Sequence, residues 1–390
     1  MTLHFAPDVA FPVADPYARL NSFIANRQFD RPTLVMDLDR VACQYRALKA
    51  GLGRADIHYA VKANPARQII ARLVDLGSHF DAASKAEIAL CLEEGAEPAD
   101  ISFGNTVKRA SDIAWAYGQG IRLFAADAEE ELQKIAANAP GSSIYIRLIV
   151  ELSQADWPLS RKFGCDRAMA LSLLDQARAL GLNPVGFSFH VGSQTRQAAM
   201  WAPTLDVFAE VWAAANAAGH QLCLLNIGGG FPAFYGEEIA APAEYAAQVM
   251  ALVDARFPGA MTVMAEPGRG MVAEAGLIVA EVMLVSRKSE RDLHRWVYLD
   301  IGRFSGLAET EGEAIRYQFQ TARDADPVGP CILAGPSCDS ADVLYEKRPV
   351  LMPLTLKAGD RVLIRNTGAY TSTYSSVCFN GFPPLDVVIL

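Results

Sequence analysis

A lysine closes one of the most apolar segments of the chain. Lys62 ends the run Ile57–Lys62, and the Asn64-Pro65 pair that follows is typical of a turn. An isolated ammonium is costly to bury. Burial lowers the pKa of a lysine and frees its amine to form an imine with an aldehyde. The structural alternative is a lysine at a strand end whose ammonium reaches solvent.

A histidine occupies a similar position in the segment Ser188–Gln194, where His190 is followed by Gly192 and Ser193. A histidine at such a position is often a packed structural residue. A flat imidazole can instead stack on a flat aromatic ligand, and the Gly-Ser backbone can donate hydrogen bonds to an anion. The segment is therefore a candidate binding turn.

Three consecutive glycines, Gly228–Gly230, come directly after the apolar segment Cys223–Ile227. Consecutive glycines allow positive φ angles and let backbone N–H groups converge on phosphate oxygens. The alternative is a flexible turn, and the spacing is not the GxGxxG of a dinucleotide-binding fold. The triple glycine is a candidate phosphate site.

A carboxylate and a guanidinium flank a Pro-Gly turn in the segment Ala265–Arg269. The planar fork of Arg269 matches the oxygens of a phosphate. Glu266, at the end of an apolar run, can hold a proton on a ring nitrogen. The alternative for this motif is an ion pair across the turn.

Two later turns carry further reactive groups. The segment Gly335–Asp342 places the Cys338 thiol beside Asp339. This thiol is either a small apolar residue or a proton donor next to a cation-binding carboxylate. The segment Thr367–Thr371 contains Tyr370, whose phenol can cap a phosphate or fill a domain interface.

These motifs are individually weak, but together they match one ligand. They supply an amine for an aldehyde, an imidazole face for a ring, an acid for a ring nitrogen, and Gly, Ser, Arg and Tyr groups for a phosphate. An aromatic aldehyde phosphate with a ring nitrogen is pyridoxal phosphate. The sequence therefore predicts this cofactor, and no metal ion is expected.

The elements that position these residues alternate between strand and helix patterns over residues 40–270. Eight of each in strict alternation predict a closed (β/α)8 barrel rather than an open doubly wound sheet, with ligands at the carboxyl ends of the strands. The predicted strands are Ile57–Pro65, His79–Ser84, Ile101–Asn105, Arg122–Asp127, Ser143–Val150, Gly186–Gly192, Cys223–Phe231 and Met261–Gly268. The predicted helices that precede them are 40–52, 66–77, 85–95, 108–120, 128–139, 166–181, 197–219 and 242–257.

Residues 271–390 have a different pattern, with short β-rich runs separated by turn residues. They predict an all-β second domain, which residues 1–39 are expected to join through a strand at Pro32–Asp39. The predicted strands of this C-terminal part are Ala275–Ser286, Trp296–Ile301, Pro330–Leu333, Arg361–Ile364 and Leu385–Leu390.

Composition excludes several classes of protein. The 390 residues are 51% hydrophobic and 20% charged, as in a globular enzyme. No apolar run is long enough for a membrane span, and Met1–Asp15 lacks the order of a signal peptide. Seven scattered cysteines without a CxxC pair favour reduced thiols in a cytoplasm. A net charge of −9 disfavours nucleic acid and anionic membranes and attracts cationic small molecules.

The chain resembles the barrel-type pyridoxal-phosphate decarboxylases, which include ornithine, lysine, diaminopimelate and arginine decarboxylases. The resemblance runs from about Pro32 to Pro384, and it is greatest to bacterial ornithine decarboxylases of a type that also accepts lysine. It is carried by the motifs Tyr-Ala-Val-Lys-Ala-Asn (59–64), Phe-Asp-Ala-Ala-Ser-Lys-Ala-Glu (80–87), His-Val-Gly-Ser (190–193), Gly-Gly-Gly-Phe-Pro (228–232), Glu-Pro-Gly-Arg (266–269), Cys-Asp-Ser-Ala-Asp (338–342), Gly-Ala-Tyr-Thr (368–371) and Phe-Asn-Gly-Phe (379–382).

The resemblance implies a role for each matching residue. Lys62 forms the imine with pyridoxal phosphate, His190 stacks on its ring, and Glu266 bonds the pyridine nitrogen. Asp81 and Glu87 lie nearby in the first strands. Arg147 lies close to Lys62, and the phosphate is held by Ser193, Gly229, Gly230, Gly268, Arg269 and Tyr370.

The resemblance also implies a head-to-tail homodimer with shared active sites. Cys338 and Asp339 reach the site from the other subunit, and Cys338 protonates Cα after CO2 has left. The implied activity is decarboxylation of a basic amino acid, L-ornithine to putrescine in polyamine biosynthesis and also L-lysine to cadaverine.

Substrate choice depends on the distal pocket. Diaminopimelate enzymes carry Cys-Glu-Ser where this chain has Cys338-Asp339-Ser340, and an aspartate suits a distal ammonium. Animal-type ornithine decarboxylases place a second aspartate in a Tyr-Asp pair, which the segment Asp300–Glu313 lacks. Glu309 or Glu313 is the expected substitute, and the choice between ornithine and lysine stays open.

Alternatives to a basic amino-acid decarboxylase remain. One is diaminopimelate decarboxylase, and another is a racemase or Schiff-base aldolase on the same barrel, against which the Cys338-Asp339 pair argues. A third is a non-catalytic relative that regulates polyamine synthesis. The intact Lys62, Glu266 and Cys338 argue against that reading.

Overall fold

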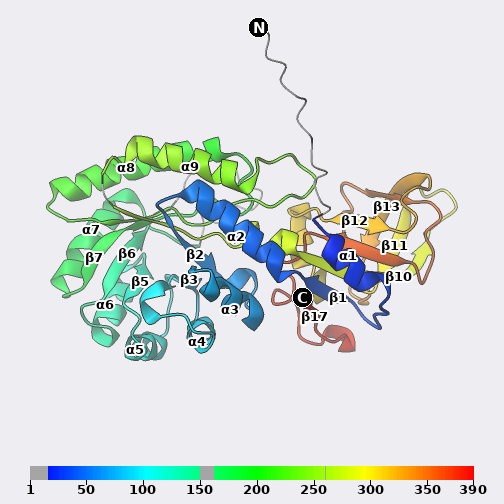
Figure 1. Ribbon diagram of the computed structural model, residues 1–390, viewed down its shortest axis with the longest axis horizontal. Coiled ribbons are helices and arrows are strands. Elements are labelled where there is room, and N and C mark those ends of the chain that lie inside the picture. The colour runs from blue at the N-terminus through cyan, green and yellow to red at the C-terminus, as the bar shows by residue number, and fades with distance from the viewer. Residues whose placement is uncertain (1–15, 150–161, 260) are drawn as a thin grey trace, which may run out of the picture.

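The computed structural model describes residues 16–149, 162–259 and 261–390, which form two parts (Figure 1). A barrel of strands surrounded by helices lies on one side, and a β domain lies on the other. The barrel is coloured mainly from cyan to green. The β domain combines blue N-terminal elements with yellow-to-red C-terminal ones. The beginning and the end of the described chain therefore contribute to the same part of the molecule.

Eight parallel strands close into a barrel, and β9 pairs with β2 to complete the ring. Parallel strands covered on both faces need apolar residues throughout, and these strands are almost entirely buried. The predicted (β/α)8 barrel is confirmed. The strands are β2 (Asp56–Ala60), β3 (His79–Ala82), β4 (Ile101–Phe103), β5 (Leu123–Ala126), β6 (Ser143–Arg147), β7 (Asn183–Ser188), β8 (Leu224–Asn226) and β9 (Thr262–Ala265).

Helices on the outside of the barrel alternate with the strands, and several begin at a side-chain cap. Asp37, Ser84 and Asp166 each accept a hydrogen bond from a backbone N–H in the first turn of the following helix. Such a cap typically stabilises a helix by about 0.5–2 kcal/mol. The helices are α2 (Leu38–Leu52), α3 (Arg67–Asp75), α4 (Lys85–Glu93), α5 (Ala110–Gly118), α6 (Glu129–Asn138), α7 (Arg167–Ala179), α8 (Ala202–Ala217) and α9 (Pro242–Arg256).

A nine-stranded mixed sheet forms the β domain. Strand β1 (Thr33–Met36) pairs antiparallel with β10 and parallel with β17, so an N-terminal strand lies between C-terminal ones. Residues 1–15 of the expected N-terminal contribution lie outside the described residues. The C-terminal strands are β10 (Gly276–Ser286), β11 (Arg295–Leu299), β12 (Gln318–Thr321), β13 (Val328–Ala334), β14 (Val343–Leu344), β15 (Val350–Pro353), β16 (Arg361–Arg365) and β17 (Asp386–Ile389).

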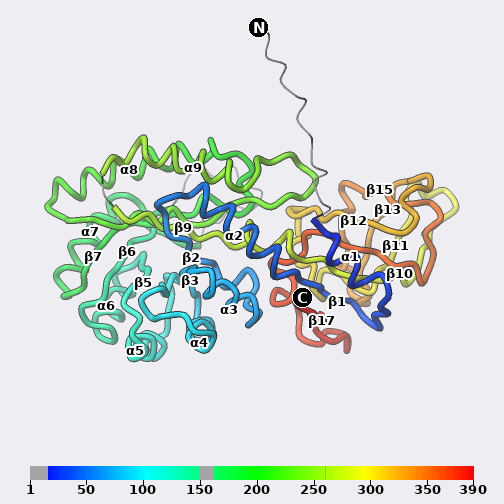
Figure 2. The backbone as a smooth tube through the Cα atoms, in the orientation of Figure 1, coloured from blue at the N-terminus to red at the C-terminus, as the bar shows by residue number. Residues whose placement is uncertain are grey.

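Two short helices, α1 and α10, lie near the points where the chain passes between the β domain and the barrel. Helix α1 (Ala18–Ala25) packs Leu20 and Ile24 against the sheet of the β domain. The chain enters the barrel through α2 (Figure 2). It leaves the barrel after β9 through α10 (Arg269–Val272). The division expected between residues 270 and 271 falls within α10, and the exact boundary stays a prediction.

Most predicted barrel strands run past the observed ones at their carboxyl ends, because the chain turns outward there to form the site. Lys62 lies on the 3-10 turn Val61–Ala63 and not in a strand. The strand predicted to reach Val150 ends at Arg147, and Val150 lies outside the described residues. The sequence pattern did not predict β12, β14 and β15, which have only two to four residues each.

Candidate active site

A cavity of about 230 Å³ lies where the carboxyl ends of the barrel strands meet the β domain. A more open cavity of about 630 Å³ adjoins it and shares Lys62, Tyr370 and Tyr374 with it. The sequence reading gave no role to Ala60, Phe231 or Tyr374, whose side chains form part of the wall. The smaller cavity is lined by Ala60, Lys62, His190, Ser193, Gly229, Gly230, Phe231, Glu266, Gly268, Arg269, Glu309, Tyr370 and Tyr374.

Lys62 stands between the two cavities on a turn that both domains hold. The Ala60 N–H donates to Pro267 O at 3.1 Å, and the Tyr370 N–H donates to Ala63 O at 2.8 Å. The Lys62 side chain is 49% exposed, and its Nζ lies 3.8 Å from Asp81 Oδ2. The amine is therefore accessible from the cavities while its backbone is fixed.

The ionisation of Lys62 differs from the prediction. Desolvation lowers its pKa, but the Asp81 carboxylate, helped by Tyr370 and Glu266, outweighs this effect, and the pKa lies above its ordinary value. The prediction that burial alone would free this amine is wrong, because the Asp81 carboxylate outweighs desolvation. The amine is an ammonium paired with Asp81.

Asp81 reaches Lys62 from the barrel interior. Burial raises the pKa of Asp81 against the attraction of Lys62 and Arg147. Within the described residues, neither Asp81 Oδ1 nor the hydroxyl of Tyr145 has a hydrogen-bond partner. Both oxygens face Gly104, where an added Cβ would overlap Asp81 Oδ1. A buried carboxylate oxygen without a partner is expected where a ligand or a water molecule completes the site.

Glu87 and Arg147 lie at the edges of the site. Glu87 lines the larger cavity and accepts the Ala83 N–H at 2.6 Å, and burial raises its pKa. The Arg147 guanidinium lies 5.1 Å from the centre of the Phe163 ring and lines neither cavity. Its charge still reaches the site, because it helps to lower the pKa of His190.

Glu266 is tied to the glycine turn by a residue to which the sequence reading gave no role. Asn226 Nδ2 donates to Glu266 Oε1, and Asn226 Oδ1 accepts the Gly228 N–H at 2.8 Å. The only sequence signal was a polar residue at the end of an apolar strand. Burial, followed by the charge of Asp81, raises the pKa of Glu266 to about 8. At neutral pH this carboxyl group holds a proton that a ring nitrogen could share.

His190 is a neutral imidazole in this environment. Desolvation, followed by the charges of Arg147 and Lys62, lowers its pKa well below the ordinary value. Its Nδ1 accepts the Gly192 N–H at 3.0 Å. This hydrogen bond assigns the ring proton to Nε2. A neutral, fixed ring at the cavity wall is suited to stacking on a flat ligand.

Hydrogen-bond donors for an anion line the smaller cavity, whose wall does not include Asp81. Gly228 and Gly230 have positive φ angles of 69° and 109°, which turn the backbone around the cavity. No described residue accepts a hydrogen bond from the N–H of Gly229 or Gly230. Ser193 also lines this wall, beside Arg269. These groups form a cradle for a phosphate.

Arg269 and Glu309 form a buried ion pair in the same wall. The two Nη atoms of Arg269 lie 2.8 and 2.6 Å from the two carboxylate oxygens of Glu309. The Tyr370 ring lies 5.0 Å from the guanidinium. Both oxygens of Glu309 are thus engaged, and the expectation that Glu309 binds a substrate ammonium is not supported by this geometry.

Three other predicted residues lie outside both cavities. Glu313 accepts hydrogen bonds from Arg316 at 2.9 Å and from Arg348 at 3.2 Å, and it lines neither cavity. Cys338 and Asp339 are exposed on a β-domain turn, and they too are absent from the walls around Lys62. Among the described residues, a single chain therefore does not bring Cys338 and Asp339 to Lys62.

The cavity residues fit pyridoxal phosphate. Lys62 presents an amine, Glu266 a proton-holding carboxyl group and His190 a neutral ring. The two glycine amides have no protein acceptor among the described residues and are available to a phosphate. Asp81 lies beside Lys62, and its unpartnered Oδ1 is available to a ligand or a water molecule.

Comparisons with known proteins agree with this fit. Residues 38–273 match the family model described as pyridoxal-dependent decarboxylase, pyridoxal binding domain. The lysine/ornithine decarboxylase of Selenomonas ruminantium is 35% identical over 362 residues, covering 91% of this chain and 88% of that protein. Ornithine decarboxylase 2 of Drosophila melanogaster is 32% identical over 361 residues, covering 90% of each.

Solved structures share the whole fold. The crystal structure of SrLDC in complex with PLP and cadaverine has a TM-score of 0.84 at 33% identity, covering 96% of this chain and 93% of that one. The lysine/ornithine decarboxylase of Vibrio vulnificus, complexed with cadaverine, has a TM-score of 0.84 at 31% identity, covering 95% and 97%. Because the family model covers more than half of this chain and its cavity fits the cofactor, the chain belongs to the pyridoxal-dependent decarboxylase family.

Proposed function

We propose that this protein decarboxylates a basic amino acid, L-ornithine in preference to L-lysine, and releases putrescine or cadaverine for polyamine synthesis. One observation carries the proposal: a cavity that fits pyridoxal phosphate around Lys62, in a chain 35% identical to a lysine/ornithine decarboxylase. Two relatives of known structure hold cadaverine, a product of this reaction class.

The residues of the cavity have different chemical roles. When bound, pyridoxal phosphate supplies an aldehyde that joins an amine and a ring that accepts the electron pair left when CO2 departs. Lys62 Nζ anchors the cofactor and later takes part in releasing the product. Glu266 keeps a proton at the ring nitrogen, and His190 holds the ring by one face.

Asp81 and Lys62 together control protons near the reacting atoms. The Asp81 carboxylate favours the charged form of Nζ, so a proton must leave Nζ before the amine can react. Asp81 Oδ2 lies 3.8 Å from Nζ and is the acidic partner in this ion pair. Asp81 is therefore proposed to orient the amine and to receive or return this proton.

Cys338 and Asp339 are proposed to act from the partner subunit of a homodimer. The support is that both lie on an exposed β-domain turn and line neither cavity around Lys62 of their own chain. In this arrangement the Cys338 thiol delivers a proton to Cα of the substrate, and the Asp339 carboxylate binds the distal ammonium. A cavity of about 630 Å³ lies beside Lys62.

Substrate preference follows from charge. Asp339 attracts the distal ammonium of ornithine or lysine, whereas the distal carboxylate of diaminopimelate would meet it as a like charge. Glu309 and Glu313 are engaged with arginines, which leaves Asp339 as the candidate acid. One methylene separates ornithine from lysine and is worth about 1–3 kcal/mol in a pocket, so the ranking of these two is the finer part of the proposal.

Two alternatives lead to different observations. A diaminopimelate decarboxylase would need a cationic partner for the distal carboxylate, and a non-catalytic regulator would not need the Lys62–Asp81 pair. The described part of the chain contains no helix that is long and apolar enough to cross a membrane. We propose a cytoplasmic location, supported by seven cysteines that are all unpaired.

A product assay tests the proposal. Purified protein with pyridoxal phosphate is incubated separately with ornithine, lysine, arginine and diaminopimelate, and the amines formed are separated and quantified. Putrescine from ornithine should form with the highest kcat/KM, followed by cadaverine from lysine. A higher kcat/KM for diaminopimelate would overturn the assignment of the distal pocket.

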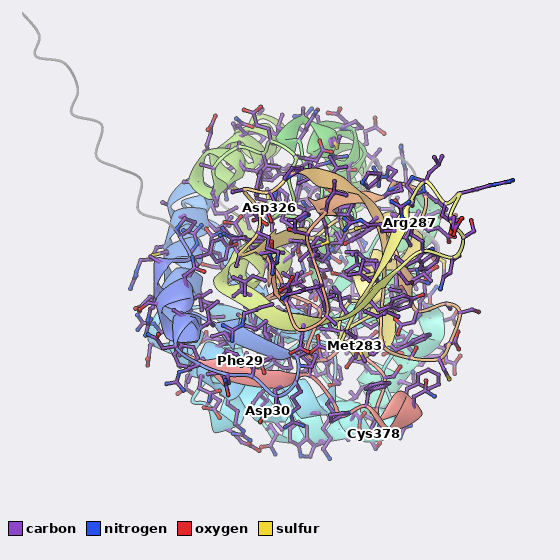
Figure 3. All side chains as sticks on the ribbon, turned by 90° about the vertical axis from the view of Figure 1, so that its right-hand side faces the viewer. Phe29, Asp30, Met283, Arg287, Asp326 and Cys378 are labelled. Carbon is purple, nitrogen blue, oxygen red and sulfur yellow. The ribbon has the colours of Figure 1, made fainter. Side chains whose placement is uncertain are left out.

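Asp339→Ala tests the pocket itself. It should raise the KM for ornithine strongly, because a cation in a partly desolvated pocket loses its charged partner. The matched control is Asp30→Ala, which removes an exposed aspartate elsewhere on the β domain and should leave KM unchanged (Figure 3). Equal KM values for Asp339→Ala and wild type would remove Asp339 from the site.

A further inference from the structure

Asn226 holds its amide in one orientation behind the cavity wall. It is the last residue of β8, is fully buried and lines neither cavity. Its Oδ1 accepts the Gly228 N–H at 2.8 Å. Because a backbone N–H can only donate, the amide oxygen must face Gly228, and the amide NH2 group therefore faces Glu266. A ligand can fill the cavity without displacing this amide.

The amide makes the two oxygens of Glu266 unequal. Asn226 Nδ2 donates to Oε1. The oxygen of a carboxylic acid that carries no proton is the better acceptor, so this contact favours the proton on Oε2. Oε2 forms no hydrogen bond with a described residue and is not fully buried, and Glu266 lines the smaller cavity. The proton of this acid is thus favoured on the oxygen that remains free for a ligand.

The same amide joins Glu266 to the glycine turn. The Glu266 N–H donates to Gly228 O at 2.8 Å, so the backbone and the side chain of Glu266 are both tied to this turn. The N–H groups of Gly229 and Gly230, for which no described residue is an acceptor, follow directly. A ligand with a phosphate at one end and a ring nitrogen at the other has a fixed length. Asn226 therefore fixes the two ends of its site relative to each other.

Several charged groups act on the same carboxyl group. Burial, followed by the charge of Asp81, raises the pKa of Glu266. The hydrogen bond from Asn226 opposes this rise more than the charges of Lys62 and Arg147 do. The other ionisable groups around it are the neutral side chains of Tyr145 and His190.

We propose that Asn226 is a positioning residue that places the proton of Glu266 on Oε2, the oxygen left for the ring nitrogen of pyridoxal phosphate. By donating to Oε1, the amide also stabilises the negative charge that remains when this proton is shared with the ring. The inference rests on the role proposed above for Glu266, and it does not depend on which amino acid is decarboxylated.

Asn226→Leu is the direct test, because it removes the donor with little change in side-chain size. In the cofactor-free protein, the infrared band of the Glu266 carboxyl group is followed as the pH rises, as a difference from the matching Glu266→Gln protein. The wild-type band should disappear as the pH rises through about 8. In Asn226→Leu it should persist to a pH about one unit higher or more, because the ionised form has lost a charge-assisted hydrogen bond. A merely structural asparagine would change stability without moving this titration.

Asn226→Asp covers the case in which Asn226→Leu does not fold, since a carboxylate can still accept the Gly228 N–H. It places an oxygen beside Oε1 in place of the NH2 group, so the two acids should retain a proton to a higher pH than Glu266 alone. The control is Asn183→Leu. Asn183 begins β7 at the other end of the barrel and donates to Ser143 Oγ at 3.2 Å, and its loss should leave the titration unchanged. A wild-type titration in a folded Asn226→Leu or Asn226→Asp protein would overturn the proposal.

A pair of ligands separates this proposal from the role of Glu266 itself. The cofactor-free proteins are titrated with pyridoxal phosphate and with its 1-deaza analogue, in which a C–H group replaces the ring nitrogen. Wild type and Asn183→Leu should prefer pyridoxal phosphate, and Asn226→Leu should lose about tenfold of that preference. An undiminished preference in Asn226→Leu would contradict the positioning role alone. Equal affinities of wild type for both ligands would contradict the role of Glu266 and this proposal with it.

Discussion

At the scale of single residues, three of the acids around the site are in different electrostatic situations. Asp81 faces an ammonium, Glu266 is held by an amide, and Glu309 is neutralised by a guanidinium. Glu266 is the one whose pKa is raised to about 8, because burial and the nearby Asp81 oppose its ionisation. Environment, and not residue type, therefore decides which acid can hold a proton for the ring nitrogen.

Glu266→Gln should abolish most of the catalytic rate. An amide cannot share a proton with the ring nitrogen as a carboxyl group does, so the ring accepts electrons less well. By analogy with the loss of one charge-stabilising group, kcat should fall by about 100- to 1000-fold. Glu210→Gln, on the exposed surface of α8, is the control and should keep wild-type kcat. Near-full turnover of Glu266→Gln would exclude the ring-nitrogen role.

The same residue predicts a pH dependence of stability. The pKa of Glu266 is about 8 in the folded, cofactor-free protein and close to 4.5 when unfolded, so the folded state binds one more proton between these values. Stability from this group is full below pH 4.5 and is lost as pH rises through 8. Urea unfolding of cofactor-free wild type and Glu266→Gln should show the variant gaining relative stability from pH 5 to 8. A constant difference would contradict the raised pKa.

At the scale of elements, the turns that follow the barrel strands carry the site. The sequence predicted this position for Lys62, His190, Gly228–Gly230 and Glu266, because polar or glycine residues there interrupt apolar runs. It could not predict the pairing of Arg269 with Glu309, which come from different domains. Nor could it predict that Asn226 supports Glu266, because a single amide at a strand end has no distinctive pattern.

Element boundaries show the same limit. Apolar residues continue past the ends of β2 and β6, so the sequence pattern extended both strands beyond the point where the chain turns. β12 and β14 were missed because one alternates with glutamines and the other has only two residues. The pattern of apolar residues along the sequence thus predicted the barrel. Contacts between the two domains, such as the Arg269–Glu309 pair, determine the wall of the cavity and could not be predicted.

Gly104→Ala tests whether the turn after β4 must lie close to Asp81 on β3. An added Cβ would overlap Asp81 Oδ1, so the carboxylate would have to move from its position beside Lys62. Such a displacement near reacting groups should lower kcat/KM by about 100-fold. Gly118→Ala is the matched control, because a Cβ there meets nothing within 4 Å. Equal activity of the Gly104 variant and wild type would show that Asp81 is not needed in this position.

At the scale of the whole molecule, one chain supplies the cofactor cavity but does not bring Cys338 or Asp339 to it. Figure 3 views the β domain end-on, with Cys378 near its edge on the loop that also contains Asn380. Asn380 Oδ1 accepts the Cys338 N–H at 3.0 Å, which fixes the Cys338 turn to this loop. An exposed, fixed turn of this kind is suited to insertion into a partner's site.

Hybrid dimers test this arrangement. Lys62→Ala and Cys338→Ala should each be inactive, and mixing them should restore about a quarter of wild-type activity after random exchange of two-fold dimers. Half of the dimers are then hybrids, and each hybrid has one intact site. No recovery, despite exchange shown by mass spectrometry, would place both residues in the site of one chain.

The central claim is that the Lys62 site decarboxylates a basic amino acid. The most direct measurement is release of labelled CO2 from carboxyl-labelled L-ornithine by the protein loaded with pyridoxal phosphate, with putrescine quantified in the same samples. Equal amounts of CO2 and putrescine are expected from wild type, and neither from Lys62→Ala. Cofactor-loaded protein that releases no CO2 from ornithine or lysine, or a Lys62→Ala variant as active as wild type, would contradict the account.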